Sequence, residues 1–76
     1  MITNEQIAAI GGRLRNARES AGLSGRRASE AAMVSYDSIL RIERGQTLGC
    51  TYTVLSLCEA YGCDPAEIFA GIFDKD

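Results

Sequence analysis

Apolar residues recur along most of the chain at steps of three and four, the spacing that places side chains on one face of an α-helix. The first such run consists of Ile7, Ile10, Leu14 and Ala17. A Thr3–Gln6 capping box precedes this run and Gly22 follows it, so a helix is predicted over residues 4–20. The chain contains one proline, and no alternation of apolar and polar residues is long enough to predict a strand.

Four shorter helices are predicted after the first. Their expected ranges are residues 25–32, 35–44 and 51–61, with a short last helix that opens in "DPAEIFAG". Side chains that can cap free amide groups mark three starts, at Ser24, Ser35 and Asp64, and the last of these forms a capping box with Glu67. Buried positions of the third helix should be Ile39 and Ile42. The predicted core face of the fourth consists of Val54, Leu55, Leu57, Cys58 and Tyr61.

The length of the chain, 76 residues, fits one small domain. We therefore expect an all-α fold, a compact five-helix bundle over residues 1–76 with a loose tail at 72–76. No apolar run approaches the roughly 20 residues needed to cross a bilayer. The N-terminal "MITNEQIAAI" lacks the basic start and apolar stretch of a signal peptide. A cytoplasmic location is expected.

Residues that commonly carry catalysis or bind metals are sparse. The chain has no histidine, so no Ser–His or Cys–His pair can form. Cys50, Cys58 and Cys63 are odd in number and include no CxxC unit, which argues against a disulfide framework and a zinc site. Cys58 and Cys63 are expected to be small core residues, with Cys50 more exposed. We expect no enzyme, no metal, no cofactor and no small-molecule ligand.

The formal net charge of −2 conceals an uneven distribution. Residues 13–44 hold seven arginines against four acidic residues, a net +3, whereas residues 45–76 hold one lysine against five acidic residues, a net −4. This asymmetry predicts a basic face and an acidic back. A solvated mixture of charges with no partner is the alternative.

The second and third predicted helices are short and are joined by a tight turn at "AMVS". The third is capped by serine and rich in polar residues, as in a helix-turn-helix. Here the motif spans about residues 24–45. In this arrangement the first helix supports the second, whose front residues enter the major groove of DNA.

Three segments extend this likeness over about sixty residues: "IGGRLRNARESAGLS" (10–24), "VSYDSILRIERG" (34–45) and "TVLSLCEAYGCDPAEIF" (53–69). On these residues the chain resembles the phage-repressor and Cro-type helix-turn-helix domain, often called the XRE family. The resemblance implies a lambda-repressor-like bundle with a central helix-turn-helix that binds double-stranded DNA, usually as a homodimer. It also implies residence on the nucleoid.

The resemblance implies a role for several residues. Base contacts are expected from Tyr36 and Asp37, at the front of the recognition helix, and from Arg41 one turn further on. Arginine is the commonest reader of guanine. Backbone contacts are expected from Arg26, Arg27, Ser35, Arg44, Gln46 and Thr47. Arg18 and Glu43 match a structural salt bridge of the family. Arg13 and Arg15 either approach DNA or simply solubilise the first helix.

Asp37 and Tyr36 each leave alternatives open. Asp37 could accept a hydrogen bond from a cytosine amino group, hold Arg41 four residues later, or strengthen the positive end of the helix dipole. Tyr36 could stack on a thymine methyl or a sugar, or lie at the rim of the interface.

Three positions depart from the family pattern. Gly25 stands where the family usually has a phosphate-contacting glutamine, and Arg26 and Arg27 would supply that contact instead. Ser29 replaces a small alanine and Met33 replaces the turn glycine. A non-glycine residue in a left-handed conformation costs about 1 kcal/mol, so an altered turn is expected.

The resemblance implies a sequence-specific, repressor-like transcriptional regulator that reads the major groove with its third helix. The alternative is a protein-interaction module that retains the fold and binds DNA weakly or not at all. Ile72 and Phe73 are candidates for a dimer surface. They could instead pack on the core of their own domain.

Overall fold

The computed structural model describes residues 1–73, and within this range the chain is all-helical. Its helices are α1 (Asn4–Ser20), α2 (Gly25–Ala32), α3 (Tyr36–Glu43), α4 (Thr51–Tyr61) and α5 (Pro65–Phe69). The predicted all-α, five-helix architecture is confirmed. The third helix is one residue shorter at each end than predicted, because Ser35 and Arg44 are its caps. Residues 74–76 of the predicted tail lie outside the described range.

The helix starts follow from capping side chains. At α1, the Thr3 amide donates to Gln6 Oε1 at 2.8 Å and the Gln6 amide donates to Thr3 Oγ1 at 3.1 Å, which is a complete capping box. Asp64 and Glu67 form the second box, at α5, where Pro65 occupies the first turn. Each cap satisfies amide groups that have no partner within the helix.

The turn between α2 and α3 is tight although it lacks glycine. Met33 adopts the left-handed conformation, with φ 56° and ψ 42°, at a cost of about 1 kcal/mol. Ser29, the other departure nearby, spans this turn: its hydroxyl donates to the Val34 carbonyl at 2.6 Å, and the Val34 amide donates to the Ser29 carbonyl at 3.2 Å. A hydrogen bond of this kind contributes about 1 kcal/mol. The serine therefore offsets the strain at Met33, and the turn forms.

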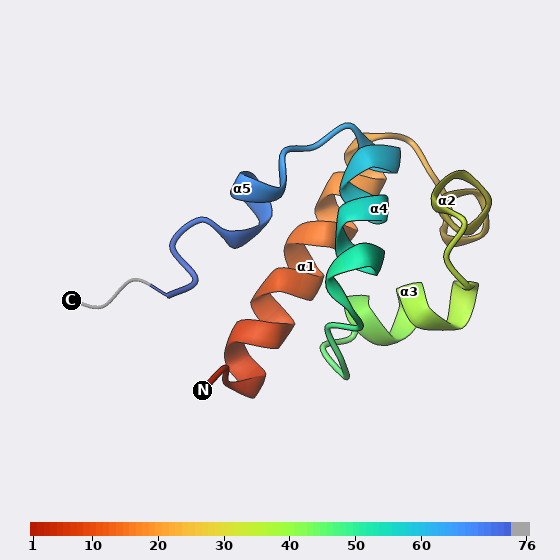
Figure 1. Ribbon diagram of the computed structural model, residues 1–76. Helices are drawn as coiled ribbons and strands as arrows, with labels where there is room; N and C mark the ends of the chain where they lie inside the picture. The colour runs from red at the N-terminus through yellow and green to blue at the C-terminus, as the bar shows by residue number, and fades with distance from the viewer. Residues whose placement is uncertain (74–76) are drawn as a thin grey trace.

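The core takes side chains from all five helices, with α1 and α4 at the centre of the bundle, α2 and α3 on one side and α5 on the opposite side (Figure 1). Six side chains in it are almost completely buried: Ile10, Leu14, Ile39, Ile42, Leu57 and Cys58. The prediction that Leu55 faces this core is wrong, since 47% of that residue is exposed. The buried positions of α4 follow steps of three and four from Val54, and Leu55, one residue after Val54, falls outside that stripe.

The backbones of α1 and α3 approach closely at Gly11, which is buried. An alanine Cβ there would fall far inside contact distance of the Ile42 carbonyl oxygen, and 3.3 Å from Glu43 Cα. Glycine is therefore required for α1 to support the back of α3. Among residues 1–73, no helix has the combined length and apolar character that spanning a membrane requires.

Candidate nucleic-acid interface

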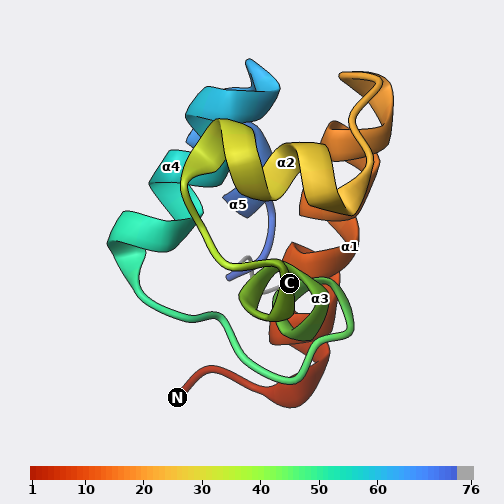
Figure 2. The ribbon, with the colours of Figure 1, turned by 90° about the vertical axis from the view of Figure 1, so that its right-hand side faces the viewer.

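The helices α2 and α3 lie together on one side of the molecule, where they form its surface (Figure 2). The inner side of α3 is fixed by Ile39 and Ile42, whose exposed fractions are 0% and 1%. The outer side carries Asp37, Arg41 and Arg44, which are exposed and follow one another at steps of four and three residues. One stripe of a helix is thus charged and exposed while the opposite stripe is anchored in the core.

The front of α3 is organised by Ser35. Its hydroxyl accepts from the Ser38 amide at 3.2 Å and donates to the Ser38 hydroxyl at 2.8 Å. Because the hydroxyl is engaged in capping, any anion at this helix start would meet the backbone amides first. Asp37 lies in this first turn, and within residues 1–73 no ion pair joins it to Arg41. The free protein therefore does not use Asp37 to hold Arg41.

The start of α2 lies close to the start of α3. The guanidinium carbon of Arg26 lies 4.9 Å from the centroid of the Tyr36 ring, within the range of a cation–π interaction. Tyr36 is 37% exposed, so its ring is only partly available to a partner. Arg27 is exposed, and its amide donates to the Ser24 cap at 3.1 Å. Four residues predicted to contact DNA thus cluster where the two helices begin: Arg26, Arg27, Ser35 and Tyr36.

The segment after α3 holds the remaining predicted contacts. Arg44 is the C-cap of α3 and is exposed, as is Gln46, whose amide donates to the Arg41 carbonyl at 2.9 Å. Thr47 is half-buried, and its hydroxyl accepts from the Gly49 amide at 3.0 Å. The hydroxyl of Thr47 therefore shapes the loop, whereas the side chains of Arg44 and Gln46 face solvent.

Arg18 and Glu43 join α1 to the end of α3. Two hydrogen bonds link them, from Nε to Oε2 at 2.8 Å and from Nη2 to Oε1 at 3.0 Å, and the exposed fractions of their side chains are 13% and 7%. Arg18 also donates to the Leu23 carbonyl at 2.9 Å. The hydrogen bond to Glu43 raises the pKa of Arg18 above its ordinary value. Burial raises the pKa of the neighbouring Tyr61 to about 12.

Neither interpretation of Arg13 from the sequence describes its position. Its guanidinium donates to carbonyl oxygens at the end of α5, those of Glu67 at 3.4 Å, Ile68 at 3.1 Å and Ala70. A cation there complements the free carbonyls and the negative end of the helix. Arg13 is therefore a structural residue that ties α5 to α1. The sequence gives no local signal for this role, because the partners lie 54 to 57 residues away.

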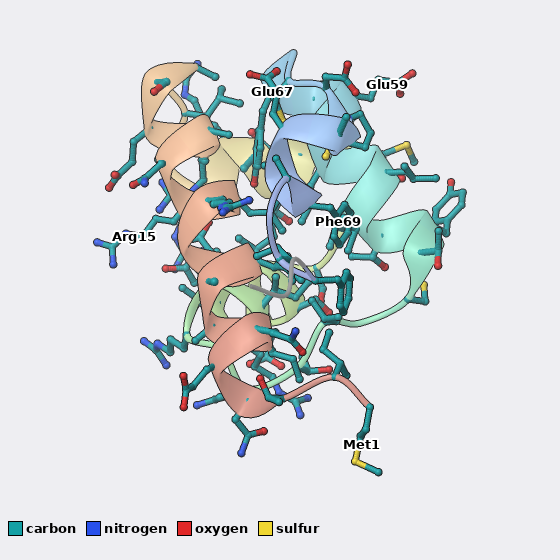
Figure 3. All side chains as sticks on the ribbon, turned by 90° about the vertical axis from the view of Figure 1, so that its left-hand side faces the viewer. Met1, Arg15, Glu59, Glu67 and Phe69 are labelled. Atoms are coloured by element: carbon teal, nitrogen blue, oxygen red, sulfur yellow. The ribbon has the colours of Figure 1, made fainter. Side chains whose placement is uncertain are left out.

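Arg15 lies at the surface of α1 and points away from the body of the domain (Figure 3). It pairs with Glu19 at 3.4 Å, and 61% of its side chain is exposed. The solvated alternative therefore describes it. In the same view, Glu59 and Glu67 lie near the end of α4 and the start of α5 (Figure 3).

The two candidates for a dimer surface differ in environment. Ile72 is half-buried and packs against the core, and its carbonyl accepts from the Gln6 side chain at 3.0 Å. Phe73 is 60% exposed. Ile72 thus contributes to the core of its own domain, and Phe73 remains accessible.

A protein-family model described as a helix-turn-helix domain matches residues 9–69. The match extends from α1 to the end of α5 and includes both α2 and α3. No curated protein matches the sequence significantly.

Proposed function

The chain belongs to the helix-turn-helix domain family, in its XRE and Cro-type class, and from this premise we propose that it is a sequence-specific, repressor-like regulator of transcription. Helix-turn-helix domains are DNA-binding modules, and α3 is the helix that would enter the major groove. That groove is about 12 Å wide and admits an α-helix. The regulator would act in the cytoplasm, on DNA of the nucleoid.

The observation that carries this proposal is the contrast between the two sides of α3. Ile39 and Ile42 anchor one side in the core, whereas Asp37, Arg41 and Arg44 are exposed on the other. A rigid helix with an accessible charged stripe is what base recognition requires, since side chains must reach base edges from a fixed position.

Arg41 is the proposed base reader, because a guanidinium can donate two hydrogen bonds to the O6 and N7 atoms of guanine. Tyr36 and Asp37 would contact bases at the front of the helix, where the carboxylate of Asp37 can accept from cytosine. Phosphate contacts would come from the start of α2, the cap of α3 and the segment after it: Arg26, Arg27, Ser35, Arg44, Gln46 and Thr47. Such contacts position the protein without reading sequence.

The net charge of −2 does not oppose this role. The exposed arginines at residues 26, 27, 41 and 44 all lie on α2 and α3 or at their ends. Two exposed acidic residues, Glu30 and Asp37, lie on the same helices, whereas Glu59 and Glu67 lie on another side (Figure 3). The local field at α3 is what a phosphate backbone would meet, because distant exposed charges are screened beyond about 10 Å.

We further propose that the protein binds DNA as a homodimer on a two-fold site. One small domain neutralises few phosphates, and two domains on half-sites one helical turn apart would double the contacts. Phe73 is the accessible apolar residue of the predicted dimer surface, whereas Ile72 would act indirectly by supporting it from the core.

A protein-interaction module with weak DNA binding is the second candidate. The position of Glu59 and Glu67 away from α3 favours it, because acidic side chains there would suit a basic protein partner (Figure 3).

Arg41→Ala and Arg44→Ala test the proposed roles, and each serves as the control of the other, since both remove one exposed arginine from the same stripe. With a duplex selected by the wild type from a random pool, Arg41→Ala should weaken binding by about 1–3 kcal/mol and relax the choice of one base pair. Arg44→Ala should weaken binding to all sequences alike. It should also reduce the slope of log binding constant against log salt concentration by about one.

Both variants should unfold at the temperature of the wild type, because neither side chain is buried. Equal weakening on all sequences by Arg41→Ala would assign that residue to the phosphates, and a base-selective loss with Arg44→Ala would reverse the two roles. Binding that resists added salt would contradict both.

A further inference from the structure

The ring of Tyr36 rests on the backbone of α2 at Gly25. A Cβ atom placed on Gly25 would lie 2.7 Å from Cε1 of that ring and 3.3 Å from Cδ1. Carbon atoms do not approach to 2.7 Å without a clash, so no side chain fits at position 25 while the ring keeps its place. Glycine is otherwise a poor residue inside a helix. The contact gives a reason for its presence at the first position of α2.

The same ring carries the guanidinium of Arg26 over it, at 4.9 Å from the centroid. Stacking of this kind leaves the N–H groups at the edge of a guanidinium free to donate to a phosphate. An exposed arginine that is already held in place loses less conformational entropy when it binds. Tyr36 therefore favours one arrangement of Arg26 before any partner arrives.

We propose that Gly25, Tyr36 and Arg26 form one unit across the helix-turn-helix, in which Gly25 admits the ring and the ring positions the Arg26 guanidinium for a DNA phosphate. The inference rests on the proposed function. Within it, Gly25 is a positioning residue that does not touch DNA. The glycine at position 25 and the tyrosine at position 36 thereby belong together, since the ring occupies the space that a side chain at position 25 would fill.

Gly25→Ala isolates this role from folding. The atoms that must move are the outer end of an exposed tyrosine, so the ring should swing away at little cost to the fold. An alanine also favours the helix over a glycine. Gly12→Ala is the matched control, because a Cβ at Gly12 meets nothing within 4 Å and Gly12 lies on α1, outside the helix-turn-helix.

The experiment combines NMR of the free protein with binding to the duplex that the wild type selects. Nuclear Overhauser effects should connect the Gly25 Hα protons to the Tyr36 ring in the wild type. Gly25→Ala should unfold no earlier than the wild type and bind about 3–10-fold more weakly, with a salt dependence lowered by about one unit, as for Arg26→Ala. Gly12→Ala should bind as the wild type does. In a Tyr36→Ala background, Gly25→Ala should change the affinity less than twofold.

Wild-type affinity of Gly25→Ala would overturn the inference, as would the same loss in the Tyr36→Ala background. Absence of the Gly25–Tyr36 Overhauser effect would overturn it before any DNA is added. A wild type that shows this effect but binds no duplex at low salt would instead refute the proposed function, and with it the role of the unit in DNA binding.

Discussion

Gly11→Ala should unfold the domain or lower its free energy of unfolding by about 3 kcal/mol or more. The added Cβ would overlap the Ile42 carbonyl oxygen and would lie 3.1 Å from the carbonyl carbon of the same residue. Both atoms belong to the backbone of α3, so no side-chain rotation can relieve the clash, and α1 and α3 must separate. Overpacking of flexible core side chains alone costs about 1–3 kcal/mol. Small domains commonly have only about 5 kcal/mol of stability.

Gly12→Ala is the adjacent control for this prediction as well. The substitution is chemically identical, but the new Cβ meets nothing within 4 Å. Alanine in a helix interior is favoured over glycine by about 0.5–1 kcal/mol, so this variant should unfold a few degrees above the wild type. Thermal unfolding followed by circular dichroism measures both effects. If the two variants melted at similar temperatures, the close approach of α1 and α3 would be wrong.

Glu43→Gln should lower the free energy of unfolding by about 3 kcal/mol. The substitution keeps the shape of the side chain but removes its charge, and the Arg18 guanidinium, only 13% exposed, loses its counter-charge. Breaking a fully buried pair from one side costs about 3–5 kcal/mol, because the remaining charge is uncompensated, and this largely buried pair should fall at the low end of that range. The raised pKa of Arg18 means that its stabilising contribution is complete below the ordinary pKa of arginine and is lost only above it.

Glu19→Gln provides the matched comparison. It removes the same charge from an arginine–glutamate pair, but the side chains of Arg15 and Glu19 are 61% and 53% exposed. An exposed pair contributes about 0–1 kcal/mol, so Glu19→Gln should melt close to the wild type. Chemical denaturation of the three proteins measures the difference. Equal stability of Glu43→Gln and Glu19→Gln would show that the Arg18–Glu43 pair is a surface contact in solution.

Gly11→Ala and Glu43→Gln act at the same place, the inner side of α3. Gly11 sets how closely the backbone of α1 supports Ile42, and Glu43 ties the end of α3 to Arg18. The exposed stripe with Arg41 keeps its direction only while these contacts hold. Loss of DNA binding in either variant would therefore follow unfolding and would not indicate a contact with DNA.

The helix limits were predictable because their signals are local. Thr3 with Gln6, and Asp64 with Glu67, are capping boxes that can be recognised within four residues of sequence. The buried pair Ile39 and Ile42 follows from helical spacing in the same way.

The features that sequence reasoning missed depend on contacts between helices. Arg13 binds carbonyls of α5 that are more than 50 residues away, and no local pattern marks such a partner. Leu55 is hydrophobic and lies in an apolar helix, but the packing of α4 decides which stripe is buried. The hydrogen bond of Ser29 across the turn at Met33 could be identified only in the structure, although both residues stood out as departures from the family pattern.

The candidate site was predictable in its location and less so in its internal contacts. The exposed stripe of α3 follows from the spacing of residues 37, 41 and 44. The stacking of Arg26 on Tyr36 does not, because it requires the α2–α3 turn to bring two helix starts together and a glycine at position 25 to leave space.

An NMR titration of the full chain with its selected duplex, repeated at higher salt, tests the central claim most directly. We expect the largest changes in amide chemical shift at residues 25–27 and 35–47, and an affinity that falls steeply as salt is added. Changes confined to the end of the bundle near Glu59 and Glu67, or no change at low salt, would contradict the reading of DNA by α3.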